Sequence, residues 1–277
     1  MRLVNVQTLE FEDFIGEVGI DIPLYAFLSH TWGEEEVSFA DHISEQSWSK
    51  IVYEKIRGCC RIAKSEGFQY VWIDTCCIDK SSSAELSEAI NSIFKWYSDA
   101  AVCYVYISDV DSSEDPTALK SSFSLSRWFT RGVFLGSDWV EIGTKKSLCA
   151  AVSRITHIGR KMLEEGRWAT SSIAEKMSWA SGRRTTRLED QAYSLLGLFN
   201  VSMPLLYGEG SKAFLRLQQE IVKKSDDQSI FAWSYSKDKY LHLQTSGLMA
   251  LSPDHYPFEV VNRMVRVRLR LVDRSKH

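Results

Sequence analysis

The sequence predicts an α/β protein built around a parallel sheet with helices on its faces. Three short apolar runs that alternate with two amphipathic segments carry this prediction. The runs are residues 24–28, 70–74 and 101–107, and the segments between them are residues 48–65 and a stretch that begins at Ser82. Strands that alternate with helices form parallel sheets, because each helix returns the chain to the same end of the sheet.

The apolar runs have the character of buried central strands. Residues 70–73 are four apolar residues that lead directly into Asp74. A run without polar alternation is typical of a strand that is covered on both faces. Between the strands, residues 48–65 carry apolar side chains at helical spacing, and Ser82 with Glu85 forms a capping-box pattern at the start of a second helix.

The rest of the chain divides into a helical part and a β-rich part. We expect an α/β unit over residues 1–145, a helical extension over 146–227, and a β-rich C-terminal segment over 228–277, for which truncation is one reading. Helices are predicted over 146–165, 171–180, 186–199 and 211–224, the third from a capping pair of Thr186 and Glu189. Short strands are predicted over 133–135, 230–233 and 265–271.

Composition and charge argue against several classes of protein. The 277 residues include 33 Lys and Arg and 36 Asp and Glu, for a net charge of −3, which gives no support to a nucleic-acid partner. No apolar run approaches the roughly 20 residues that cross a bilayer, so no membrane partner is expected. The six cysteines show no CxxC spacing, so no metal site is expected. The N-terminus does not resemble a secretory signal, and we expect a reduced, cytoplasmic protein.

Polar residues follow each of the three predicted strands. In open parallel sheets, ligands bind outside the carboxyl ends of the strands, so we expect a site there. Glu34, Glu35 and Glu36 are read as a solvated loop beyond the first strand. The candidate site residues are Ser29, His30, Trp32, Asp74, Asp79, Ser108 and Asp109, together with Arg131, which precedes the short predicted strand at 133–135.

Several of these residues have two readings. Asp74 either hydrogen-bonds a ligand or caps the turn after its strand. His30 either takes part in acid–base chemistry or is a structural histidine. Trp32 either stacks on a planar ring or closes the core above the sheet. Arg131, together with Arg127, either clamps a pyrophosphate, forms a surface for a partner, or lies on the exposed face of a short helix.

Three blocks of the sequence resemble the fungal heterokaryon incompatibility (HET) domain. The first is Tyr-Ala-Phe-Leu-Ser-His-Thr-Trp-Gly at residues 25–33, and the second is Tyr-Val-Trp-Ile-Asp-Thr-Cys-Cys-Ile-Asp-Lys at residues 70–80. The third begins with Ser-Arg-Trp-Phe-Thr-Arg-Gly at residues 126–132. Their order, spacing and aromatic content agree with the family together. Residues 177–235 are similar to the segment that follows the domain in many such proteins.

The resemblance implies a role in fungal non-self recognition, in which the HET domain triggers cell death when incompatible strains fuse. Its partners would be further copies of the chain or other incompatibility and signalling proteins. The domain is considered related to TIR domains, which implies a flavodoxin-like sheet. Some TIR domains hydrolyse NAD with a glutamate, so NAD is the substrate that the resemblance suggests, and it implies no bound cofactor.

The third block departs from the family. After the equivalent of Gly132 the family continues with Trp-Thr-Leu-Gln-Glu-Leu, whereas this chain passes directly to Val133. The glutamate that aligns with the catalytic residue of TIR domains is therefore absent. Either coding sequence was skipped at this point, or the chain is a degenerate homologue. The candidates that remain for catalysis are Asp74 and His30.

Three functional hypotheses follow. The first is a signalling module that self-associates and triggers cell death. The second is a TIR-like enzyme that cleaves the nicotinamide–ribose bond of NAD, with ligand contacts from Ser29, Trp32, Asp79, Asp109 and Arg131. The third is an inactive paralogue that has lost its catalytic acid. The first two are compatible with each other, because an enzyme can depend on assembly.

Overall fold

The structure is a computed structural model, and the chain in it forms two compact units, Met1–Gly166 and Arg167–His277. It describes residues 1–33, 35–44, 53–118, 123, 132–166, 168–181, 185–231, 259–261 and 264–266.

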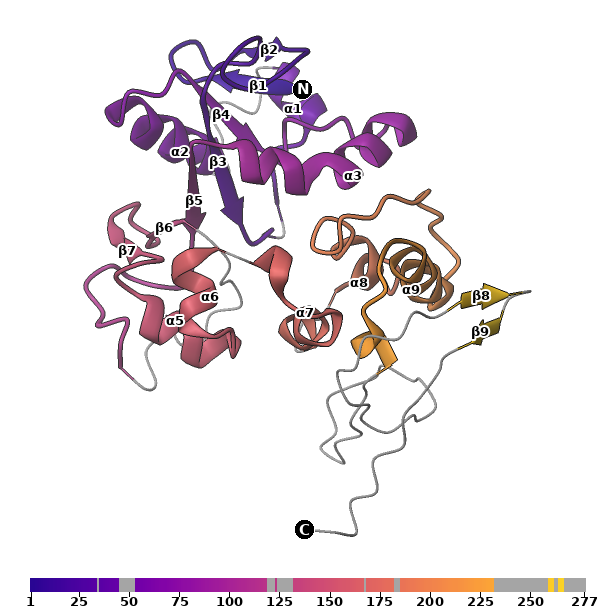
Figure 1. The fold of residues 1–277 in the computed structure, drawn as a ribbon. Helices are drawn as coiled ribbons and strands as arrows, with labels where there is room; N and C mark the ends of the chain where they lie inside the picture. Colours follow the sequence, from indigo (N-terminus) through magenta and orange to yellow (C-terminus); the bar gives the residue numbers. More distant parts are fainter. Residues whose placement is uncertain are drawn as a thin grey trace. The chain divides into compact units, whose positions relative to one another are not determined.

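A mixed sheet of seven strands forms the centre of the described part of the first unit (Figure 1). The strands lie in the order β2-β1-β4-β3-β5-β6-β7. The four inner strands pair in parallel, whereas β1, β2 and β7 pair antiparallel at the two edges. Their bounds are β1 Arg2–Asn5, β2 Phe11–Asp13, β3 Tyr25–His30, β4 Tyr70–Ile73, β5 Val102–Tyr106, β6 Val133–Leu135 and β7 Glu141–Thr144.

This sheet confirms the predicted α/β class. The order β4-β3-β5-β6 of the parallel strands is the doubly wound order of flavodoxin-like sheets. The antiparallel edge strands make the sheet mixed, so the expectation of a parallel sheet holds for its centre only. In doubly wound sheets the ligand crevice lies where the connections diverge, at the carboxyl ends of the central strands. Here that point is the end of β3, which lies between β4 and β5.

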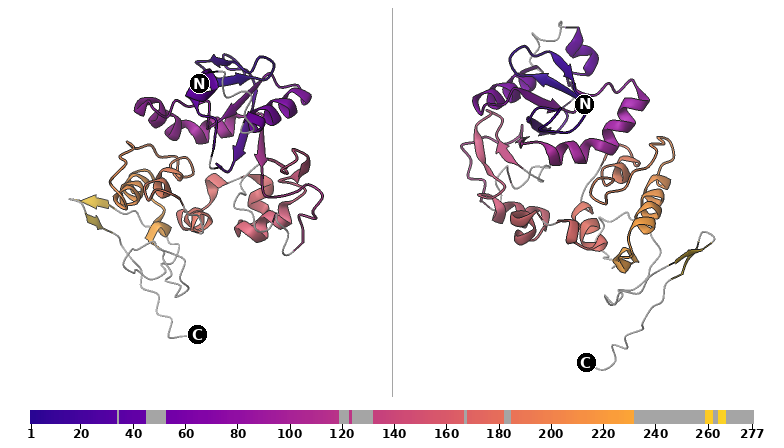
Figure 2. Two further views of the ribbon diagram at one scale, coloured as in Figure 1. Left: turned by 180° about the vertical axis from the view of Figure 1, so that it is seen from behind. Right: turned by 45° about the horizontal axis from the view of Figure 1, so that its top comes forward.

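Helices α2 and α3 pack on opposite faces of the sheet (Figures 1 and 2). On one face, the Tyr25 hydroxyl donates a hydrogen bond to the carbonyl of Trp96 in α3. On the other face, the Tyr104 hydroxyl donates to Glu66 Oε2 at the end of α2, at 2.7 Å. The helices of this unit are α1 Phe39–Ile43, α2 Glu54–Ser65, α3 Ser83–Asp99, α5 Cys149–Thr156 and α6 Arg160–Glu165.

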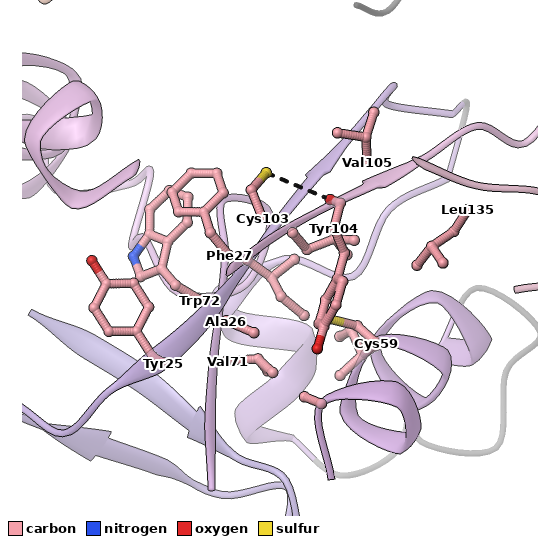
Figure 3. Close-up of a cluster of buried hydrophobic side chains, with 14 of the residues drawn as sticks. Tyr25, Ala26, Phe27, Cys59, Val71, Trp72, Cys103, Tyr104, Val105 and Leu135 are labelled. Carbon is pink, nitrogen blue, oxygen red and sulfur yellow. Dashed lines mark hydrogen bonds between the residues drawn. The ribbon is translucent and has the colours of Figure 1, made fainter. Parts of the chain in front are cut away.

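The core beside α3 is aromatic. Phe27 and Trp72 stack with their ring centroids 4.5 Å apart (Figure 3). The ring centroids of Trp72 and Trp96 lie 5.7 Å apart. Figure 3 also shows Cys59 and Tyr104 on the side of the sheet that α2 covers. All six cysteines are free and buried, and burial raises the pKa of Cys59 well above its ordinary value. The thiols act as small apolar side chains of the core.

The single helix predicted over 146–165 is wrong, because two helices form there. His157 ends α5 in the left-handed conformation, with φ of 58°, and Gly159 precedes α6. The Ser153 hydroxyl donates to the carbonyl of Ile158 at 2.7 Å, which stabilises the turn between the helices. A residue in the left-handed conformation ends a helix and turns the chain in a new direction. The apolar periodicity of residues 146–165 gives no sign of this break.

The long helix predicted from Thr186 is also wrong in the second unit. Glu189 does not close a capping box. Its carboxylate accepts hydrogen bonds from the backbone N–H groups of Gly208 and Gly210, at 2.8 and 2.9 Å. The helix α8 is therefore limited to Asp190–Tyr193, and irregular turns follow it.

Two other predicted helices of the second unit are present, with starts that differ by one or two residues. The predicted helices 171–180 and 211–224 correspond to α7 and α9. The predicted strand at 230–233 is wrong in its described part, where a 3-10 turn forms instead. The elements are η2 Trp168–Thr170, α7 Ile173–Ala180, α8, α9 Lys212–Lys224, η3 Gln228–Phe231, β8 Glu259–Val261 and β9 Met264–Arg266. No helix in the described ranges has the length and apolar character needed to cross a membrane.

Gly58 in α2 allows close contact with Trp139, and we expect Gly58→Ala to destabilise the first unit. A Cβ atom at this position would lie 2.2 Å from Cε2 of Trp139, whose indole stacks on Tyr106. The expected loss is about 1–3 kcal/mol in the free energy of unfolding by urea. In a Trp139→Ala background the same change should stabilise the helix by up to about 1 kcal/mol. An equal loss in both backgrounds would show that the indole is not the cause.

His42 should make the stability of the first unit fall at acidic pH. Its Nε2 lies 2.6 Å from the carbonyl of Leu9 and its Nδ1 lies 2.9 Å from the Tyr53 hydroxyl, so the neutral ring donates to Leu9 and accepts from Tyr53. Burial lowers the pKa of His42, and the hydrogen bond to Leu9 opposes this only in part.

The unfolded chain therefore takes up a proton at higher pH than the folded chain. The contribution of the neutral His42 to stability is fully present above the ordinary histidine pKa of about 6.5 and declines below it. Urea unfolding at several pH values between 5 and 8 would measure this slope, and His42→Gln should flatten it. The slope would have another origin if that variant kept it unchanged.

Candidate functional site

His30 is the last residue of β3 and its side chain is buried. The residue is 4% exposed. Side chains alternate along a strand, so His30 points to the face that α2 covers and Ser29 points to the opposite face. The structure therefore separates two residues that the sequence had grouped at one strand end.

Two carboxylates flank the imidazole of His30. Its Nε2 lies 3.6 Å from Glu36 Oε2, and its Nδ1 lies 3.8 Å from Asp74 Oδ1. Both separations suit an ion pair but exceed the length of a hydrogen bond. Within the described part of the chain, both ring nitrogens and Asp74 Oδ1 are buried without a hydrogen-bond partner. Such atoms are uncommon in folded proteins, and each one calls for an explanation.

Glu36 is held as a carboxylate by its surroundings. The backbone N–H of Gly33 donates to Glu36 Oε1 at 2.6 Å, and the Lys55 ammonium donates to the same oxygen. Burial raises the pKa of Glu36, but the contacts with His30, Lys55 and Gly33 outweigh it and bring the pKa to about 2. The side chain is only 14% exposed, so the sequence-based reading of Glu36 as part of a solvated loop is wrong.

Trp32 lies above Asp74 and is half exposed, at 54%. Its indole N–H donates to Asp74 Oδ2 at 2.8 Å. The Lys80 ammonium lies 3.8 Å from the centroid of the indole ring, at a cation–π distance. Desolvation lowers the pKa of Lys80, and the negative charges of Asp74 and Glu36 oppose this change. The indole is thus fixed in place by one hydrogen bond and one cation.

We call this group of side chains the His30 cluster. Two carboxylates face two ammonium groups in it, so their charges nearly cancel. Ordinary protein side chains in this arrangement can accept hydrogen bonds from a ligand, hold a planar or apolar surface, and exchange a proton. The members of the cluster are His30, Trp32, Glu36, Lys55, Asp74 and Lys80.

The remaining predicted site residues lie elsewhere or have local roles. Asp79 accepts hydrogen bonds from the backbone N–H and the hydroxyl of Ser81, at 2.9 and 2.6 Å, which is an Asx-type turn before α3. These contacts lower the pKa of Asp79. Ser108 and Asp109 lie in the exposed turn after β5. Arg131 lies outside the described residues.

Sequence reasoning missed Glu36, Lys55 and Lys80. Lys80 closes the second sequence block, so its place within that block was a usable signal. Glu36 follows Gly33 by three residues, a spacing at which a carboxylate can fold back onto a backbone N–H. Lys55 lies on α2, and nothing in its local sequence points to the end of β3.

Across the described ranges, no group of three or more His, Cys, Asp or Glu side chains is suited to hold a metal ion. The His30 cluster contains two potential ligand carboxylates and one imidazole, but Glu36 is already engaged by Lys55 and Gly33.

The class that the structure defines is a doubly wound α/β domain with polar side chains at the carboxyl end of its central strand, which is the place where such sheets bind ligands. Comparison with known proteins narrows this class. Residues 25–170 match the family described as "Heterokaryon incompatibility protein (HET)", which is more than half of the chain. The chain therefore belongs to the HET family, as its three sequence blocks predicted. Residues 212–266 match a domain of unknown function, DUF8212.

The chain is also similar to a curated fungal protein. It is 45% identical over 222 residues to "Vegetative incompatibility protein HET-E-1" of Podospora anserina. The match covers 73% of this chain and 16% of that protein, so the chain spans only a small part of its relative's length. No solved structure matches the chain.

Lys55→Met should destabilise the first unit, because it removes the ammonium group that pairs with the Glu36 carboxylate. The expected loss is about 1–3 kcal/mol at pH 7, the usual effect of leaving a buried charged group unpaired. The pKa of Glu36 is lowered in the folded state, so the stability that its contacts provide is present above its ordinary pKa of 4.5 and is lost as pH falls toward about 2.

Urea unfolding of a double-mutant cycle would measure this interaction. Lys55→Met should cost less in a Glu36→Gln background, because the neutral amide does not need the ammonium. Equal losses in the two backgrounds would assign the effect to lost packing of the lysine stem and not to the ion pair.

Proposed function

We propose that this chain is the cell-death-triggering signalling module of a fungal non-self recognition protein. It would act in the cytoplasm, through self-association or through other incompatibility proteins. The observation that carries the proposal is the match to the HET family over residues 25–170. That range includes β3, β4, β5 and β6, and with them every member of the His30 cluster.

Expression of the chain in a filamentous fungus tests this proposal. We expect growth arrest and loss of viability when the chain is induced, measured by dye exclusion and colony counts. Asp74→Asn should reduce killing at least tenfold, because it removes the charge beside His30. Asp13→Asn is a matched control, since the Asp13 side chain lies on β2 and is 70% exposed, and its 3.6 Å ion pair with Arg2 at such an exposed carboxylate contributes little to stability. Equal killing by both variants, or none by the unmodified chain at similar expression, would contradict the proposal.

A second candidate function is cleavage of the nicotinamide–ribose bond of NAD. The observation that favours it is the pair of carboxylates that flank His30, one of which accepts a hydrogen bond from the half-exposed indole of Trp32. A carboxylate that remains ionised, as Glu36 does, stabilises the oxocarbenium-like centre of glycosidic cleavage. Asp74 would hold ribose hydroxyls, and Trp32 would pack against a ring. Against this candidate, the chain lacks the glutamate that the family places after Gly132.

Release of nicotinamide from NAD by the purified chain tests the second candidate. A matched protein with Trp-Thr-Leu-Gln-Glu-Leu inserted between Gly132 and Val133 separates the alternatives. If only the protein with the insertion is active, the result supports the NAD-cleaving function. It also shows that this chain is inactive because the segment is missing. Silence of both proteins, in monomeric and assembled states, would favour an inactive paralogue. Genomic sequence between these two codons would show whether the segment is encoded.

A further inference from the structure

The strand β2 lies at one end of the seven-stranded sheet, and within the described residues only β1 pairs with it (Figure 1). The Phe14 N–H donates to the Met1 carbonyl at 2.8 Å, and the Met1 amino group donates to the Phe14 carbonyl at 2.7 Å. In an antiparallel pair, the backbone groups of successive residues point alternately toward the partner strand and away from it. The N–H and C=O groups of Phe11 and Asp13 therefore point away from β1.

These outward backbone groups form an open edge of the sheet. No described residue makes a hydrogen bond with them. An unpaired edge accepts a further strand, because its N–H and C=O groups form a template for pairing. Ile15, which follows in the same alternation, is 92% exposed. We call the outward backbone groups of Phe11 and Asp13, with the side chain of Ile15, the β2 edge.

The two faces of the strand beside this edge differ in charge. Side chains alternate along a strand, so Glu10 and Glu12 lie on one face, whereas Phe11, Asp13 and Ile15 lie on the other. The carboxylate of Asp13 is already paired within the first unit, at 3.6 Å. A strand that complements the β2 edge therefore carries cations on one face and apolar side chains on the other.

One segment of this chain has that pattern. Residues 265–271 read Val-Arg-Val-Arg-Leu-Arg-Leu, so a strand over them carries arginines on one face and apolar residues on the other. The first two residues of the segment belong to β9, which within the described residues pairs with β8 alone. An isolated two-stranded hairpin is at best marginally stable in water, so it gains stability when it joins a larger sheet.

We propose that the β2 edge binds residues 265–271 of a second copy of this chain as an added strand. Backbone hydrogen bonds join the segment to Phe11 and Asp13, its arginines face Glu10 and Glu12, and its apolar residues pack on the side of Phe11. Pairing of two β2 edges with each other is disfavoured, because it brings the glutamates of both copies together.

The contact joins two different surfaces of the chain. It closes a dimer when two copies exchange segments, and it forms longer oligomers when they do not. The proposal rests on the proposed function in one respect, since it supplies a surface for the self-association that is invoked there.

Sedimentation velocity of the full chain over a range of concentrations tests the proposal. We expect dimers or larger oligomers, and Glu10→Lys should weaken their association about fivefold because an attractive cross-strand charge pair becomes repulsive. Glu88→Lys is the matched control, since it reverses an exposed carboxylate on α3 and should leave association unchanged. A chain that stays monomeric at every concentration, or equal association of these two variants, overturns the proposal.

A mixture of two variants shows whether the added strand comes from a second copy. Arg268→Glu should associate about as weakly as Glu10→Lys. In an equimolar mixture, one chain keeps an intact β2 edge and the other keeps an intact segment 265–271, so the mixture should associate more tightly than either variant alone. A mixture that associates no better than its components overturns the proposal.

Hydrogen exchange locates the contact on the chain. The backbone N–H groups of Phe11 and Asp13 should exchange fast in dilute, monomeric protein and slowly at concentrations at which the chain associates. Exchange that does not depend on concentration overturns the proposal, because the edge is then either open in every state or held by a segment of the same chain.

The fungal assay separates this proposal from the proposed function. Asp13→Asn keeps the backbone groups of the β2 edge and lies on the face away from the arginines, so it remains a valid control there. Association through the β2 edge without cell death would contradict the proposed function and leave this docking site standing. Cell death caused by a chain that stays monomeric would overturn the docking site alone.

Discussion

The parallel pairing of β3 between β4 and β5 is the constraint on which the candidate site depends. Leu28 of β3 lies opposite Ile73, the last residue of β4, so β3 continues two residues past the end of its neighbour. His30 therefore reaches over the turn that begins with Asp74. On the other side, β5 continues in register with β3 up to the His30–Tyr106 pair, which covers that flank of the strand. The register of β3 and β4 thus brings His30 close to Asp74.

The two carboxylates beside the buried imidazole of His30 carry negative charge that must be balanced. Hydrogen-bond donors and cations from distant segments of the unit provide this balance. Lys55 comes from α2, the N–H of Gly33 comes from the loop after β3, and Lys80 comes from the turn before α3. Balancing charges reduce the cost of holding ionised groups away from water. The contacts of the three buried atoms nevertheless remain incomplete. Positions that a sequence leaves unsatisfied in this way are common at sites of function.

The helical unit shows why local patterns predict some elements and not others. α9 was predictable because its apolar residues recur at helical spacing. Its buried residues are Ala213, Leu217 and Ile221. The helix expected from Thr186 failed because Glu189 binds backbone N–H groups nineteen and twenty-one residues further along the chain. A carboxylate that serves as a helix cap in one context satisfies a remote turn in another, and sequence spacing does not distinguish the two uses.

The sequence by itself determined the central strands, the main helices α2, α3 and α9, and membership of the HET family, because these follow from apolar runs, helical periodicity and motif blocks. It also placed His30, Trp32 and Asp74 near one end of the sheet. Only the tertiary structure decided which side chains meet there. The pleat turns Ser29 to the opposite face, and the return of the loop after β3 brings Glu36 onto His30. Both outcomes depend on strand register and chain path, which are set by packing between segments far apart in the sequence.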